Sequence, residues 1–144
     1  MISRCDENSG TFEGVSNVIL GVGIDAVEIS RVQKSCEKEH FQNRVFTAAE
    51  IGQFDKRKVR AASDFAGKEA VVKVLGTGFS GCGPRDIEIL RDEKGAPFVK
   101  LYGGAKKLAA DQGIMSIRIS ITNTSELAMA FAVGSDEPGG EGFF

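Results

Sequence analysis

The chain has 144 residues, of which 42% are hydrophobic and 26% charged, so we expect one globular domain with its own core. A formal net charge of −2 at pH 7 argues against a nucleic-acid binder that depends on neutralising phosphates. No stretch approaches the ~20 consecutive apolar residues that cross a bilayer, so we expect no membrane span.

Cysteine usage indicates the compartment. The three cysteines, Cys5, Cys36 and Cys82, are odd in number and far apart, with no C-x-x-C pattern. This favours a reducing environment over a disulfide framework or a zinc site. We therefore predict a cytoplasmic protein.

Composition also changes at both ends of the chain. Residues 1–16 are polar, and residues 135–144 are acidic and rich in glycine. We expect an N-terminal extension, a single domain over 17–134 and a flexible tail.

The first half of the domain is predicted to be mainly helical. Residues 18–24 are apolar and indicate a buried strand, and the spacing of apolar residues predicts a helix over 28–39. Thr47-Ala-Ala-Glu50 matches a capping box, which predicts the start of a short second helix.

A long helix follows and carries the most informative pattern of the chain. Glu69 precedes Lys73 by one helical turn, and the helix ends in the turn Gly76-Thr77-Gly78. A surface ion pair followed by an ordinary glycine cap would explain these residues structurally. The alternative is phosphate chemistry. A carboxylate can bind a divalent cation, a lysine can neutralise a phosphate, and a glycine turn lets the backbone approach a ligand closely.

The second half is predicted to be mainly antiparallel strands. Two strands flank the turn signal Asp92-Glu-Lys-Gly95, a helix follows, and two alternating segments predict a final antiparallel pair. The expected ranges are strands 86–91 and 96–102, a helix within 103–113, and strands 116–121 and 127–133. Helices first and antiparallel strands later predict an α+β domain, with an antiparallel sheet packed on the long helix.

Gly21-Val-Gly23-Ile-Asp25-Ala fits the G-x-G-x-x-A pattern of dinucleotide-binding folds. However, Asp25 would place a negative charge at the anion site, and the later elements do not alternate as a parallel sheet requires. Asp25 is better interpreted either as the N-cap of the next helix or as a metal ligand. The second interpretation needs a partner carboxylate, for which Glu69 is the candidate, and two such acids suit Mg²⁺ bound to a diphosphate.

Five segments together resemble one known family. They are Gly23-Ile-Asp25 with Arg31, Phe41 to Glu50, Phe65-Ala-Gly-Lys-Glu-Ala70 with Lys73 and the glycine turn, Asp86-Ile-Glu-Ile with Asp92, Gly95 and Pro97, and Ser120-Ile-Thr-Asn-Thr with Ala128. In order and spacing they resemble the motifs of the holo-acyl carrier protein synthases, which are small 4'-phosphopantetheinyl transferases. The resemblance runs from about residue 18 to 133.

The resemblance implies transfer of phosphopantetheine from coenzyme A to a serine of an apo acyl carrier protein, releasing adenosine 3',5'-bisphosphate. By carry-over, Asp25 and Glu69 would bind Mg²⁺ against the coenzyme A diphosphate, and both would count as catalytic. Glu69, directly or through a metal-bound water, would accept the proton of the serine. Lys73 would stabilise charge on the leaving phosphate and would be the candidate to protonate it.

The resemblance also implies binding roles and an assembly. Lys73, Gly76, Thr77 and Gly78 would bind coenzyme A, as would Asn123 and Thr124. Arg31 would face the acidic carrier protein. The similar proteins form homotrimers with sites between subunits, so Asp25 and Glu69 are candidates to come from neighbouring chains.

Two positions depart from the family pattern. Asn123 stands where histidine is common, and Asp64 where many members have arginine. Losing two cationic groups would weaken coenzyme A binding unless the basic residues 56–58 or Arg60 compensate. The alternative to an active transferase is therefore a non-catalytic or attenuated carrier-binding module of the same fold.

Overall fold

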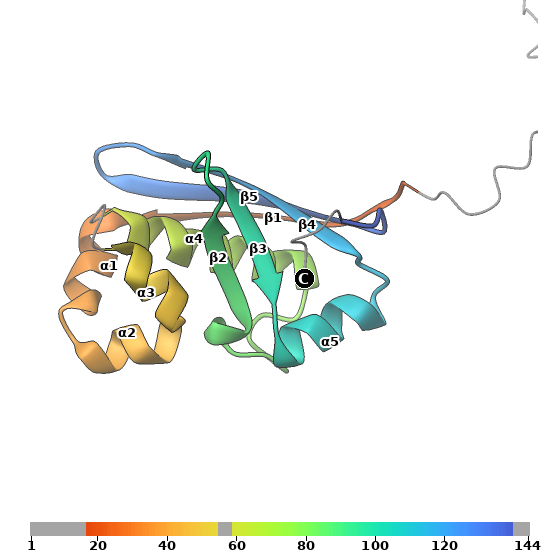
Figure 1. Cartoon of the computed structure of the whole chain (residues 1–144), viewed down its shortest axis with the longest axis horizontal. Helices are drawn as coiled ribbons and strands as arrows, with labels where there is room; N and C mark the ends of the chain where they lie inside the picture. The colour runs from red at the N-terminus through yellow and green to blue at the C-terminus, as the bar shows by residue number, and fades with distance from the viewer. Residues whose placement is uncertain (1–16, 55–58, 140–144) are drawn as a thin grey trace, which may run out of the picture.

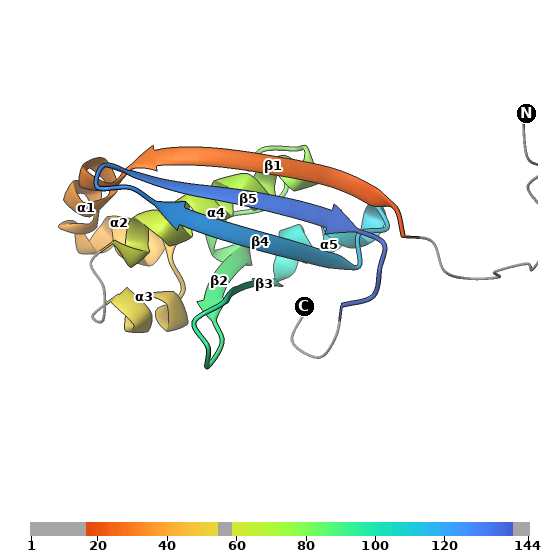
Figure 2. The same ribbon diagram turned by 90° about the horizontal axis from the view of Figure 1, so that it is seen from above.

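The computed structural model describes residues 17–54 and 59–139. Helix α4 (Arg60–Leu75) lies between a three-stranded sheet and a two-stranded hairpin (Figures 1 and 2). The remaining elements, in chain order, are β1 (Ile19–Glu28), α1 (Ile29–Cys36), α2 (Glu39–Val45), α3 (Ala48–Phe54), the 3₁₀ helix η1 (Pro84–Asp86), β2 (Ile87–Arg91), β3 (Pro97–Leu101), α5 (Gly103–Asp111), β4 (Ser116–Asn123) and β5 (Leu127–Ser135). The predicted α+β class is confirmed.

Both sheets are antiparallel, as the strand patterns predicted. The larger has the order β1-β5-β4, so the central β5 pairs with the first strand and with its own hairpin partner. Ala130 of β5 lies opposite Asp25 on one side and Ile121 on the other. The smaller sheet is the β2–β3 hairpin, and its turn is held by Asp92, whose Oδ1 accepts backbone N–H bonds from Lys94 and Ala96.

Small residues let the large sheet lie directly against α4. A Cβ on Gly23 would stand 1.9 Å from the carbonyl oxygen of Ala70, and one on Gly21 would stand 2.5 Å from that of Val74. Inward-facing Ala128, Ala130 and Ala132 of β5 are likewise buried. The two glycines of β1 therefore let the strand contact the backbone of α4 at a distance that any side chain at these positions would prevent.

Helix α4 is the centre of the core. Most of its 16 residues are buried, because the large sheet covers one side and the hairpin another. A Cβ on Gly67 would lie 3.1 Å from both Ile119 of β4 and Ile89 of β2, which shows how the two sheets meet around the helix.

Two expectations about the first half were wrong, and one of two alternatives for Asp25 is excluded. Strand β1 is not buried: its outward side chains Val22 and Ile24 are 58% and 66% exposed, because no element of the described residues covers that face. The helix expected over 28–39 is two helices, separated at residues 37–38. Asp25 does not cap a helix, since β1 continues to Glu28, which is itself the residue before α1.

Some expectations fall outside the described residues. These concern the N-terminal extension, Cys5, the basic residues 56–58 and the last part of the tail, 140–144. The first tail residues are ordered on the sheet: Ser135 ends β5, and Asp136 Oδ1 accepts the backbone N–H of Val18 at 2.8 Å. Among the residues that are described, no helix is long and apolar enough to cross a membrane.

Candidate active site

Asp25, Glu69 and Lys73 lie close together on the touching faces of β1 and α4. Lys73 Nζ is 3.2 Å from Asp25 Oδ1 and donates a hydrogen bond of 2.7 Å to the carbonyl oxygen of Ile24. The close approach at Gly23 explains the geometry, since it brings the strand within reach of a lysine on the helix. The ion pair is partly exposed, with the Lys73 side chain 53% exposed, so it stays accessible to a ligand.

The Glu69 carboxyl is electrostatically coupled to the other two groups. Its pKa is raised above the ordinary value, first by burial and then by the negative charge of Asp25, while Lys73 opposes the rise. The two acids therefore face one region within a single chain. The expectation that Asp25 and Glu69 come from neighbouring chains is not needed to bring them together.

Two adjacent carboxylates of this kind fit a magnesium ion. Mg²⁺ usually takes one or two carboxylates and completes its shell with water and substrate phosphates. The repulsion that Asp25 exerts on Glu69 is what a divalent cation would relieve. The described residues contain no group of three or more histidine, cysteine or acidic side chains placed to hold a metal without a substrate.

The glycine turn lies at the end of α4, one turn beyond Lys73. Gly76 caps the helix in the left-handed conformation (φ 75°), and Gly78 is also left-handed (φ 57°). A Cβ at either position would meet nothing within 4 Å, so these glycines are required by backbone conformation, not by crowding. The turn is exposed, and its backbone is open to a ligand beside Lys73.

Asn123 and Thr124 lie at the other end of α4. Asn123 Oδ1 accepts a hydrogen bond of 3.1 Å from Ser63, ten residues before Lys73 and so about 15 Å away along the helix. Thr124 Oγ1 accepts backbone N–H bonds from Glu126 and Leu127 and shapes the β4–β5 turn. One chain does not bring these two residues together with Lys73 and the glycine turn.

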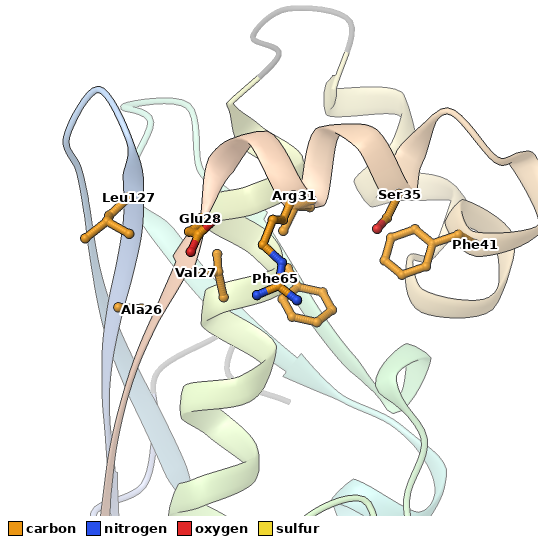
Figure 3. A pocket seen from close by; sticks show the side chains of 9 residues that line it. Ala26, Val27, Glu28, Arg31, Ser35, Phe41, Phe65 and Leu127 are labelled. Carbon is orange, nitrogen blue, oxygen red and sulfur yellow. The ribbon is translucent and has the colours of Figure 1, made fainter.

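Arg31 lines an open pocket of about 410 Å³ at the end of β1 (Figure 3). The rings of Phe41 and Phe65 line the same pocket, and in Figure 3 the Arg31 side chain extends toward the region where Phe65 is drawn. Two lining residues of the pocket are neighbours of the acids along the chain. Ala26 follows Asp25, and Phe65 is one helical turn before Glu69. A cation among apolar rings is suited to an acidic, amphipathic protein surface.

Sequence reasoning missed a buried ion pair that connects α4 to α3 and to the segment around η1. Lys68 is 1% exposed, and its Nζ donates 2.7 Å to Glu50 Oε1 and also donates to the carbonyl oxygens of Pro84 and Ile87. Glu50 Oε2 accepts the backbone N–H of Ile89.

The predicted capping box is confirmed by the two bonds between Thr47 and Glu50. However, that pattern is typical of exposed helix starts and gave no signal that Glu50 is buried.

Comparison with known proteins places the chain in a family. Residues 21–132 match the family model of the 4'-phosphopantetheinyl transferase superfamily. The chain is 46% identical over 117 residues to the holo-[acyl-carrier-protein] synthase of Lachnoclostridium phytofermentans, covering 81% of this chain and 96% of that one. It is 48% identical over 120 residues to the synthase of Clostridium novyi, covering 81% and 87%.

Solved structures agree with the sequence comparison. The acyl carrier protein synthase of Plasmodium yoelii with ADP bound superposes with a TM-score of 0.75 at 33% identity, covering 84% of this chain and 98% of that one. The Helicobacter pylori holo-[acyl-carrier-protein] synthase in complex with coenzyme A gives 0.69 at 31% identity, covering 79% and 99%. The chain therefore belongs to the 4'-phosphopantetheinyl transferase superfamily, within which it groups with the holo-[acyl-carrier-protein] synthases, and the expectation of a transferase enzyme is confirmed.

Proposed function

We propose that this enzyme transfers 4'-phosphopantetheine from coenzyme A to a serine of an apo acyl carrier protein, releasing adenosine 3',5'-bisphosphate. The observation that carries the proposal is the meeting of Asp25, Glu69 and Lys73 beside an exposed glycine turn. A relative that this chain matches over 96% of its length bears the synthase name, and one solved neighbour holds coenzyme A.

The residues divide the chemistry between them. The serine oxygen attacks the phosphorus that bears the pantetheine arm, while the bond from that phosphorus to the oxygen of the nucleotide phosphate breaks. Glu69 takes the serine proton, because it is the partly buried carboxylate that lies beside both Asp25 and Lys73. Lys73 lies where it can neutralise charge on the leaving phosphate. Catalysis then rests on positioning and charge neutralisation.

Asp25 and Glu69 would hold Mg²⁺ against the diphosphate. The ion would supply positive charge to the transferring and leaving phosphates. Lys73 already neutralises Asp25 in the protein alone, so the same lysine is positioned to move from carboxylate to phosphate when the substrate binds.

The carrier protein would dock at the Arg31 pocket. Arg31 supplies a positive charge for an acidic carrier, and Phe41 and Phe65 supply apolar contact area. Because Ala26 and Phe65 also connect the pocket to the two acids, a carrier bound there presents its serine to the reaction site. No nucleic acid or membrane partner is invoked.

The assembly would be a homotrimer in the cytoplasm. Leu20, Val22 and Ile24 of β1 and Phe131 of β5 form an outer sheet face that is at least 41% exposed at each of these positions. In Figure 1 the labelled helices all lie on the opposite side of that sheet. An exposed apolar patch of this kind marks an interface, and association of copies would cover it.

The test is the intact mass of an apo acyl carrier protein after incubation with this enzyme, coenzyme A and Mg²⁺, with and without a chelator. We expect a gain of one phosphopantetheine that the chelator abolishes. Glu69→Gln should remove the gain while carrier binding is retained, and Glu93→Gln, in the exposed β2–β3 turn, is the matched control.

Carrier binding without any mass gain, using a carrier and coenzyme that a known transferase can join, would overturn the proposal. That result would favour the non-catalytic carrier-binding module. Unchanged turnover in Glu69→Gln would remove Glu69 from the mechanism while leaving the transferase activity established.

A further inference from the structure

A glycine-rich loop, residues 76–83, connects the end of α4 to η1 and begins with the glycine turn. Three of its residues, Gly76, Gly78 and Gly81, are in the left-handed conformation, with φ of 75°, 57° and 88°. Residues 76–81 are all exposed, so little of the loop packs into the core. Because glycine leaves the backbone more freedom than any other residue, such a loop needs contacts at its ends to keep one position.

Lys68 of α4 holds the far end of this glycine loop. Its Nζ donates 2.9 Å to the carbonyl oxygen of Pro84, the residue directly after the loop, and also donates to that of Ile87. The third acceptor is Glu50 Oε1, at 2.7 Å. An ammonium has three N–H donors, so all of them have acceptors within the protein. The buried Lys68 therefore fixes the loop and has no donor left for a ligand.

Helix α5 supports the same loop from another side. A Cβ on Gly104 would stand 1.9 Å from the carbonyl oxygen of Gly81, so the first turn of α5 lies directly against the loop. Asp86 Oδ2 accepts the backbone N–H of Gly83 at 3.1 Å, and the carbonyl oxygen of Asp86 accepts that of Tyr102 at 2.8 Å. The loop is thus placed by α4 and α5 together.

The anchor and the proposed catalytic acid are consecutive residues of one helix. With 3.6 residues per turn, the side chains of Lys68 and Glu69 leave α4 about 100° apart. Glu69 can therefore lie beside Asp25 while Lys68 binds η1 and α3. The loop and the acids thus take their positions from the same turn of α4.

We propose that Lys68 is a positioning residue for coenzyme A: by holding Pro84, it keeps the glycine loop where its backbone can bind the coenzyme beside Glu69 and Lys73. The inference rests on the proposed function, in which the coenzyme lies at the glycine turn. Without this anchor the coenzyme itself would have to order the loop, and that ordering would lower its affinity.

The double variant Lys68→Met/Glu50→Leu separates anchoring from stability. It removes both buried charges, so no buried acid is left unpaired as in Lys68→Met alone, but Pro84 still lacks its anchor. The double variant should regain part of the stability that Lys68→Met loses, whereas its KM for coenzyme A should stay roughly 10-fold above that of the parent enzyme. The kcat at saturation and the KM for the carrier protein should stay near the parent values. A double variant with the parent KM for coenzyme A would overturn the inference.

Gly104→Ala displaces the same loop without touching the buried pair. Its methyl group would overlap the carbonyl oxygen of Gly81, so the KM for coenzyme A should rise here too. Gly52→Ala is the matched control, because its methyl group meets nothing within 4 Å, and it should keep the parent KM. An unchanged KM in Gly104→Ala would contradict the link between loop position and coenzyme affinity.

Binding and exchange measurements separate this inference from the proposed function. If the parent enzyme transfers nothing, calorimetry with coenzyme A and Mg²⁺ still measures the affinity, and amide hydrogen exchange at Gly83 still reports how firmly the loop is held against Asp86. Weaker coenzyme binding with faster exchange in the double variant would support the positioning role without transferase activity. Unchanged affinity in the double variant would overturn it, as would a parent protein that does not bind coenzyme A.

Discussion

Asp64 is an acid placed where burial opposes its charge. Burial raises its pKa to about 7, although the Arg91 guanidinium beside it acts in the opposite direction. In the sequence, Asp64 stands where many members of the family have an arginine, which suggested that a positive charge is missing here. In the structure the position is half of an ion pair whose cation comes from β2. The positive charge is therefore kept near this end of α4, from a different element.

The raised pKa of Asp64 predicts a pH dependence of stability. Between about pH 4 and 7 the folded chain retains a proton that the unfolded chain has released, so the free energy of unfolding falls as pH rises through this window. The slope from this one group is at most about 1.4 kcal/mol per pH unit. Urea unfolding at several pH values, with Asp64→Asn as comparison, should show a shallower fall in the variant. Parallel curves between pH 5 and 7 would contradict the assignment.

Lys68 shows what the buried pair contributes. Its ammonium joins α4 to Glu50 of α3 and to the backbone around η1, in the segment that follows the glycine turn. Lys68→Met should lower the free energy of unfolding by about 3–5 kcal/mol, because it leaves Glu50 buried without its partner. The double variant Lys68→Met/Glu50→Leu should recover part of the loss in chemical denaturation. A Lys68→Met loss below about 1 kcal/mol would mean that Glu50 finds another partner.

Among the elements, the contact of β1 with α4 sets the geometry of the site. Gly23 lies two residues before Asp25 on the same face, opposite the backbone of Ala70, which neighbours Glu69. The distance between the two acids is therefore determined by a position where a side chain does not fit.

Gly23→Ala should separate the strand from the helix. Its Cβ would overlap the Ala70 carbonyl oxygen, so we expect a loss of at least about 2 kcal/mol in stability and a larger proportional loss of transferase activity. Gly52→Ala in α3 is the matched control, since nothing lies within 4 Å of its added methyl and alanine favours helix by about 0.5–1 kcal/mol. Full activity and stability in Gly23→Ala would show that the strand has room to shift.

The elements also show what the sequence predicts and what it does not. The strand pairs were predictable because alternation and turn residues act locally, as Asp92 does in its turn. The break between α1 and α2 was missed because the apolar spacing runs on through Cys36 while the backbone turns at residues 37–38. Likewise, Lys68 and Glu50 are 18 residues apart, and no local pattern signals that they meet.

For the whole molecule, the outer sheet face is the main unexplained surface of the single chain. Ile24 and Phe131 lie opposite each other on β1 and β5 and are 66% and 45% exposed. If copies associate through this face, Ile24→Lys should convert a trimer to monomers in sedimentation or light scattering, because a lysine there would be buried without a partner. Glu93→Lys, on the exposed hairpin turn, should leave the assembly unchanged. A monomeric parent protein would refute the trimer.

Assembly bears on function because the two ends of α4 hold different parts of the proposed coenzyme site. Lys73 and Ser63 are about 15 Å apart along the helix, so the acids of one copy could be completed by Asn123 of another. Co-expressed Glu69→Gln and Asn123→Ala chains distinguish the cases, because loss of the Asn123 amide should raise the KM for coenzyme A. A shared site predicts that some mixed assemblies pair an intact Glu69 with an intact Asn123 from the neighbouring copy, so a fraction of the activity should return to the parent KM for coenzyme A. A site within one chain predicts only the high KM of Asn123→Ala, whatever the mixing ratio.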